Sequence, residues 1–209
     1  NTAAVEGRGY VNLADCQSDK ILFTNVGVDD TLVTVFENGI TEGDTDGGRG
    51  MASAQARYNF GGSVGSLLPM DFSAEARSDL VQAVALWDAR ATAWSTDSTG
   101  GTIFPVSTAG WSTGEQLYAG LHVTALSTTN NATAVTVVVQ QASSSGAGFT
   151  GAPTNRISFS AVSCNKASSF ATPIRTHSTD QPFWRARVTV ATGTSTGANA
   201  NGLVWLGMQ

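Results

Sequence analysis

Apolar and polar residues alternate along most of the second half of the chain, a pattern typical of strands with one buried face. The alternating or apolar segments are 116–126, 134–140, 156–162, 183–190 and 203–208. Between them lie stretches rich in Gly, Ser, Thr and Asn, at 127–131, 143–151 and 193–202. Short strands joined by such turns predict an antiparallel β-sandwich of the jelly-roll or immunoglobulin-like type.

The same alternation assigns side chains to faces. In segment 183–190 it directs Arg185 and Arg187 outward, and it directs the apolar positions inward: Trp184, Ala186, Val188 and Val190. In segment 116–126 it places Leu117, Ala119, Leu121, Val123 and Ala125 on one face. His122 falls on the opposite face, and Trp205 falls on an apolar face that favours core packing.

The first third has a different pattern. Asn12 and Asp15 supply a capping signal and Asn25-Val26-Gly27 a stop, which together bracket a short helix over 13–24. Strands are predicted at 31–36, 51–60 and 69–76, with a Gly- and acid-rich loop over 38–50.

Segment 78–94 fits two structures. Leu80, Ala83, Val84, Trp87, Ala91 and Trp94 match a helical face, whereas Val81, Ala83, Ala85, Trp87 and Ala89 match a strand. Periodicity alone leaves both open. A domain boundary near Ser78 divides the chain into a first domain at 1–78 and a second at 79–209.

Composition narrows the classes of partner. Charged residues make up 13% of the 209 residues, about half the usual share, and the net charge is −5. The few Lys and Arg residues are dispersed, whereas a protein that grips nucleic acid gathers them on one face. No apolar run of about 18 residues and no signal-peptide pattern is visible, so no membrane partner is expected. Cys16 and Cys164 lie far apart, which favours a reducing cytosol over a disulfide framework.

Candidate catalytic groups are few. His122 lies on a strand and His177 in a polar loop, and neither has a neighbouring Cys or a Ser in a nucleophile-type turn. Two histidines without Cys pairs at ligand spacing do not make a zinc site. We therefore expect no enzyme, no metal and no cofactor.

Two further groups of residues are candidates for binding. Glu42, Asp44 and Asp46 resemble part of a calcium loop, but the further acid and the closing bidentate Glu of the full pattern are absent, so a solvated acidic loop explains them better. Trp94 and Trp111, in Ser-, Thr- and Gly-rich surroundings, are candidate ligand contacts at the surface.

Three motifs occur in an order that resembles the second half of the tail tube (major tail) protein of long-tailed bacteriophages. They are Gly50-Met51-Ala52-Ser53-Ala54-Gln55-Ala56-Arg57-Tyr58, then Gly61-Gly62-Ser63-Val64-Gly65, then Phe72-Ser73-Ala74-Glu75-Ala76. Segments 117–123, 135–140, 155–159, 183–188 and 203–209 are similar to the β domain appended in that family. The resemblance also favours a strand within 78–94.

The resemblance implies a mostly β chain: a tail-tube-type β-sandwich or barrel with one short helix, N-terminally incomplete in this sequence, followed by an outward-facing β-sandwich. It implies a virion tail protein, made in the host cytoplasm, that forms stacked hexameric rings around the DNA channel. Its partners would be its own copies, the tape measure and terminator proteins, and DNA in transit without specific binding. An acidic, Lys-poor conduit would repel phosphate, so DNA would slide through it.

The acidic loop with Glu42, Asp44 and Asp46 is then expected at a subunit boundary or the channel mouth. The alternative is a carbohydrate- or receptor-binding β-sandwich, or a capsid decoration protein, of a phage particle. In that case Trp94, Trp111 and the loop 143–151 would make the contacts.

Overall fold

A computed structural model describes most of the chain as β-structure organised in two compact units. The described residues are 4–10, 31–46, 48–60, 69–77, 80–90, 92–94, 99–111, 116–126, 132–151, 153–162, 167–170, 174–175, 181–192 and 199–208. Unit 1 comprises residues 1–34 and 50–80, and unit 2 comprises residues 35–49 and 81–209. The predicted mostly β, sandwich-type fold is confirmed.

Unit 1 contains the strands of the first third of the chain. They are β1 (Ala4–Tyr10), β2 (Thr31–Phe36), β3 (Gly48–Phe60) and β4 (Pro69–Ala76), of which the ends of β2 and β3 reach into unit 2. β4 lies between β1 and β3 and is antiparallel to both, and β2 pairs with β3. The three strands predicted here are confirmed. The helix predicted over 13–24 lies outside the described residues.

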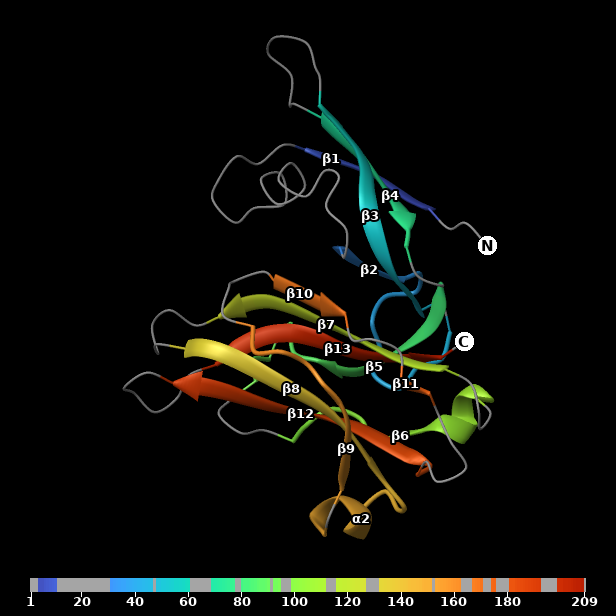
Figure 1. Ribbon diagram of the computed structural model, residues 1–209, viewed down its shortest axis with the longest axis vertical. Helices are drawn as coiled ribbons and strands as arrows, with labels where there is room; N and C mark the ends of the chain where they lie inside the picture. Colours follow the sequence, from blue (N-terminus) through green and yellow to red (C-terminus); the bar gives the residue numbers. More distant parts are fainter. Residues whose placement is uncertain are drawn as a thin grey trace. The chain divides into compact units, whose positions relative to one another are not determined.

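Unit 2 is a sandwich of two sheets (Figure 1). The first sheet has the order β5 (Val81–Asp88), β13 (Ala200–Met208), β7 (Gln116–Leu126), and two short strands, β10 (Ala167–Phe170) and β11 (Ile174–Arg175), pair with β7. The second sheet has the order β6 (Phe104–Pro105), β12 (Phe183–Thr192), β8 (Ala132–Ala142), β9 (Thr154–Ser158). Helix η1 (Val106–Ala109) follows β6, and helix α2 (Ala147–Thr150) joins β8 to β9.

The inner faces of these two sheets form the hydrophobic core of unit 2. The second sheet contributes Val135, Val137, Val139, Ile157, Trp184, Ala186, Val188 and Val190. The first sheet contributes Val84, Leu86, Leu117, Ala119, Leu121, Val123, Val204 and Leu206. The inward faces predicted for segment 183–190 and, from Leu117 to Val123, for segment 116–126 are therefore confirmed, because apolar side chains at every second residue meet between the sheets.

Segment 78–94 contains a strand, β5, and its helical interpretation is wrong. Val84 and Leu86 point into the sandwich core, while Val81, Ala83 and Ala85 on the other face are also completely buried. A strand buried on both faces is apolar at nearly every position, so it loses the period of two. This is why the sequence fitted both structures.

Residues 35–49 pack in unit 2 although the sequence places them in the first predicted domain. The backbone N–H of Gly43 donates to the carbonyl of Ala85 at 2.8 Å, and Gln82 Nε2 donates to the carbonyl of Thr45 at 2.8 Å. The segment therefore lies beside β5. The predicted division into 1–78 and 79–209 stays a prediction, and the two compact units differ from it chiefly by this segment.

Two tryptophans of unit 2 lie directly against glycines. A Cβ added at Gly120 would overlap the indole of Trp205, and one added at Gly202 would overlap the indole of Trp94. Both indoles are completely buried. The two strands that carry the glycines, β7 and β13, therefore require a residue without a side chain at these places.

We expect Gly120→Ala to lower the free energy of unfolding by about 1–3 kcal/mol, because the added methyl group must displace a buried indole. Denaturant unfolding followed by tryptophan fluorescence measures the change. Gly146→Ala is the matched control, since nothing lies within 4 Å of a Cβ at Gly146. Equal stability of the two variants would contradict the close packing of Trp205 on β7.

Candidate functional site

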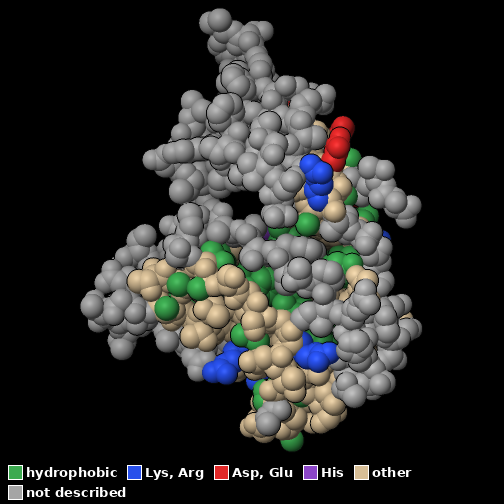
Figure 2. Space-filling view, viewed as in Figure 1, with side chains coloured by type: hydrophobic (Ala, Val, Ile, Leu, Met, Phe, Trp, Pro, Cys, Tyr) green, Lys and Arg blue, Asp and Glu red, His purple; other side chains and the backbone are tan. Residues whose placement is uncertain are grey.

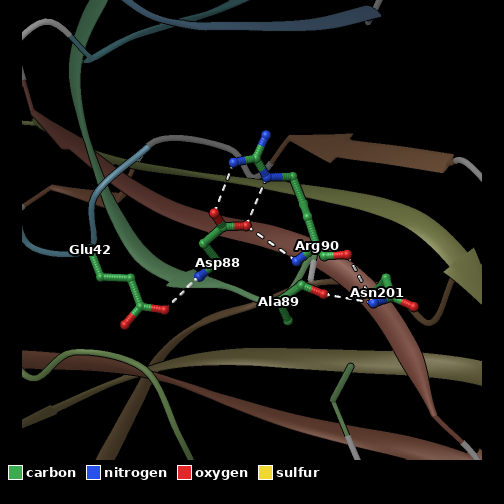
Figure 3. A network of polar contacts seen from close by, with 5 residues as sticks. All are labelled: Glu42, Asp88, Ala89, Arg90 and Asn201. Atoms are coloured by element: carbon green, nitrogen blue, oxygen red, sulfur yellow. Dashed lines mark hydrogen bonds and ion pairs between the residues drawn. The ribbon is translucent and has the colours of Figure 1, made fainter. Parts of the chain in front are cut away.

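Glu42 anchors segment 35–49 at the end of β5 (Figure 3). One carboxylate oxygen accepts a hydrogen bond from the backbone N–H of Asp88 at 2.8 Å, and the other accepts one from Thr102 Oγ1 at 3.2 Å. Glu42 also forms a parallel β-bridge with Ala85. Both carboxylate oxygens are thus occupied by groups of the same unit, and Glu42 acts here as a structural anchor.

An ion pair and an amide hold the turn that follows β5 (Figure 3). Arg90 donates from Nε to Asp88 Oδ1 at 2.8 Å and from Nη2 to Asp88 Oδ2 at 2.9 Å. Asn201 Nδ2 donates to the carbonyls of Ala89 and Arg90 at 2.9 and 3.2 Å. The bidentate ion pair fixes the turn itself. The amide of Asn201 ties this turn to β13.

The ion pair shifts the pKa of both partners toward their charged forms. The hydrogen bond from Arg90 lowers the pKa of Asp88 below its ordinary value, and partial burial opposes this only in part. The hydrogen bond to Asp88 raises the pKa of Arg90. Because Arg90 is half exposed, the pair contributes little stability and serves chiefly to fix geometry.

The three acidic residues predicted to act together have different surroundings. Glu42 faces β5, Asp44 Oδ1 accepts a hydrogen bond from the backbone N–H of Asp46 at 2.9 Å, and Asp46 itself is exposed. Among the described residues, no group of three His, Cys, Asp or Glu side chains is placed to hold a metal ion. Their position at a subunit boundary or channel mouth stays a prediction.

Trp94 is not a surface residue, and its predicted ligand contact is wrong. Its side chain is completely buried in the sandwich core, 5.9 Å from the ring of Trp87 in an edge-to-face arrangement. Its backbone forms a two-way bridge with Ala200. The Ser- and Thr-rich sequence around Trp94 suggested a surface position, but the bridge to Ala200 places this residue beside β13, with its ring in the core.

Trp111 lies at the margin of the same core. Its ring is half-buried and meets the ring of Phe104 edge to face, with 5.3 Å between centroids. Its Nε1 is buried without a hydrogen bond to any described residue. A ligand contact of Trp111 stays a prediction.

His122 lies half-buried on the face of β7 that points away from the sandwich core, as predicted. Burial lowers its pKa from the ordinary 6.5 to about 4. The imidazole is therefore neutral at pH 7 and does not provide a charge there. His177 lies outside the described residues.

A site that the sequence did not reveal surrounds Arg185 on the outer face of the second sheet. Arg185 Nε donates to Gln140 Oε1 at 3.1 Å, and Nη2 donates to the carbonyl of Phe149 at 3.3 Å. The guanidinium carbon lies 4.4 Å from the centroid of the Phe149 ring. Gln140 Nε2 in turn donates to Asn155 Oδ1 at 2.9 Å.

These contacts hold the Arg185 charge in one place with neutral acceptors from β8 and α2. Burial, and secondly the neighbouring Arg187, lower the pKa of Arg185, which nevertheless stays charged at neutral pH. The alternation of β12 indicated that Arg185 points outward. Nothing in the sequence indicated Gln140 or Phe149 as its partners, because β8 and α2 reach it only through the fold.

We expect Glu42→Ala to lower the free energy of unfolding of unit 2 by about 1–3 kcal/mol, because the Asp88 N–H and the Thr102 hydroxyl lose their acceptor. Thermal and denaturant unfolding measure it. Glu37→Ala is the control, since Glu37 is exposed, and it should change stability by less than about 0.5 kcal/mol. An equal effect of both variants would rule out the anchor.

We expect the free energy of unfolding to fall as the pH falls from 6.5 to about 4, because only the unfolded state protonates His122 in that window. Above pH 6.5 this contribution is fully present. The slope of the free energy of unfolding against pH measures how many more protons the unfolded state binds than the folded state. His122→Gln should reduce this difference by up to about one proton between pH 4 and 6.5. Denaturant titrations at a series of pH values measure the slope, and identical slopes of wild type and variant would refute the assignment.

No helix among the described residues has the length and apolar character needed to cross a bilayer. No protein-family model, no curated protein and no solved structure matches this chain. The basis for a function is therefore the chain's own motifs and geometry.

Proposed function

We propose that this chain is a structural subunit of the tail tube of a long-tailed bacteriophage, which assembles with its own copies into stacked rings around the path of the DNA. The proposal is supported by the motif order in segments 50–58, 61–65 and 72–76 and by the two-unit, mostly β architecture. Hexameric symmetry and the tape measure and terminator proteins as partners follow from the same resemblance.

The observation that carries the proposal is the edge of the unit 1 sheet. All seven residues of β1 pair with β4, and β1 pairs with no other described strand. An edge strand presents a row of unpaired N–H and C=O groups, which proteins cover, blunt or pair with another chain. Copies arranged in a closed ring would supply that pairing strand to one another.

The charge of the chain supports a conduit. With a net charge of −5, a tube of many copies would repel the phosphates of DNA and let it pass without lasting contacts. The described polar network at Glu42, Asp88 and Arg90 is occupied by mutual hydrogen bonds, as in a part that maintains shape.

The rival proposal is a carbohydrate- or receptor-binding or capsid decoration protein. It has lost one of its two aromatic contacts, because Trp94 is completely buried, and keeps Trp111 and the loop 143–151. We therefore rank it second.

Negative-stain electron microscopy of the concentrated protein should show rings or uniform tubes. Adjacent residues of a strand direct their N–H groups to opposite sides. Of the two variants Val5→Pro and Glu6→Pro, one therefore removes an N–H that faces β4, and the other removes an N–H on the outer side of β1. The second of these is the variant that tests assembly. That variant should keep the circular dichroism of the wild type and lose assembly.

Monomers of the wild type at high concentration would contradict the proposal. Monomers or trimers that bind a glycan array would favour the receptor-binding rival, and binding to empty phage heads without tubes would favour capsid decoration.

A further inference from the structure

Acidic and basic residues are unevenly distributed along this chain. Residues 104–209 contain five Lys and Arg but only two Asp and Glu, whereas residues 1–103 contain the other fourteen acidic residues. The elements of the second sheet of unit 2, namely β6, β8, β9 and β12, together with α2, contain no Asp or Glu. In Figure 2, Lys and Arg side chains lie over the lower part of unit 2, and no described Asp or Glu side chain is drawn beside them in this view.

Arg185 and Arg187 form a cationic surface, here called the arginine face, on the outside of this sheet. They are two residues apart on β12, so both side chains leave the same side of the strand, opposite the buried Trp184, Ala186 and Val188. Arg187 is exposed. The Arg185 guanidinium is held by Gln140, the Phe149 carbonyl and the Phe149 ring, all of them neutral.

This arrangement is suited to an anionic partner. Burial lowers the pKa of Arg185, and repulsion from the like charge of Arg187 on the same face lowers it further. A carboxylate placed over this face would relieve that repulsion and accept hydrogen bonds from a pre-oriented guanidinium. Because Arg185 is already ordered by its neutral contacts, binding there loses little side-chain entropy.

The same unit also carries acidic side chains, whose charge is opposite to that of the arginine face. In segment 37–46, here called the acidic segment, Glu37 and Asp46 are exposed, and their carboxylates form no hydrogen bond with a described residue. Glu42 anchors this segment beside β5, in the first sheet. The arginine face belongs to the outside of the second sheet, so the two surfaces lie on different layers of one sandwich.

We propose that the arginine face of one copy binds the acidic segment of a second copy. This inference rests on the proposed function and specifies one of its contacts. The two surfaces are complementary in charge, belong to one chain and differ from each other, which is the condition for a head-to-tail contact that repeats from copy to copy. The anchor at Glu42 orders the acidic segment before it binds.

A second copy fits this face better than an anionic polymer does. A protein that grips a polyanion gathers many Lys and Arg on one face, whereas the few Lys and Arg of this chain are dispersed. A neighbouring copy presents its few carboxylates locally, on an ordered segment, with the rest of its surface poor in charge.

The test is a charge exchange read out by sedimentation velocity. Arg187→Glu should weaken self-association about tenfold in about 0.05 M NaCl and much less in about 0.5 M NaCl, because salt screens surface charges. The double variant Glu37→Arg/Asp46→Arg should weaken it similarly. Mixing the two variants, or combining all three substitutions in one chain, should restore association, because each interface then again joins opposite charges.

Matched controls separate this contact from other effects. Ser107→Glu/Thr108→Glu changes the net charge by as much as Arg187→Glu, at two exposed residues of η1, and should leave association unchanged. Circular dichroism and the unfolding midpoint establish that each variant folds. Glu42→Ala removes the anchor of the acidic segment, so we expect it to weaken self-association as well.

The possible outcomes are distinct. Rings or tubes that form equally well from wild type and Arg187→Glu at low salt would overturn this inference and leave the proposed function standing. A wild type that stays monomeric at high concentration would overturn both. Loss of binding to dextran sulfate in Arg187→Glu, with unchanged self-association, would show that the face takes an anionic polymer and would overturn the inference.

Discussion

The burial of β5 and β13 on both faces is the constraint on which the rest of unit 2 depends. Val84 and Val204 fill the sandwich core on one side, while Ala83, Ala85 and Trp205 are completely buried on the other. In a sheet that is buried on both faces, a strand residue that lies directly against a tryptophan ring has no room for a side chain of its own. Glycines on β7 and β13 provide that room, so the positions of the tryptophans and of the glycines determine each other.

Polar contacts complete what this packing begins. Where β5 ends, Glu42 satisfies a backbone N–H that the ladder leaves open, and Asn201 satisfies two carbonyls of the turn that follows. A buried or half-buried backbone group without a partner costs more than a typical hydrogen bond contributes, so these side chains secure the end of the sheet. The same contacts order segment 35–49, which the chain inserts into unit 2 between two passages through unit 1.

The features on which the proposed assembly rests are an edge strand in unit 1 and two surfaces of opposite charge in unit 2. β1 pairs with β4 and with no other described strand, and unit 2 has cations on the outside of one sheet and carboxylates beside the other. In the part of the chain that the structure describes, His122 is neutral at pH 7 and the acids of segment 37–46 have separate surroundings. An architectural function is what we propose from the arrangement of these groups.

The sequence by itself determined the β class and the inward faces of β7 and β12. In a strand with one face in the core and one in solvent, apolar and polar residues alternate, and this alternation can be recognised in the sequence. It also suggested β5, although only the fold decided it, because a strand buried on both faces has no period. The tertiary structure alone buried Trp94, joined Glu42 to Asp88 and seated Arg185 on Phe149. Glu42 and Asp88 are 46 residues apart, and Arg185 and Phe149 are 36 residues apart. Local patterns carry no information about which distant groups will meet when two sheets pack on each other.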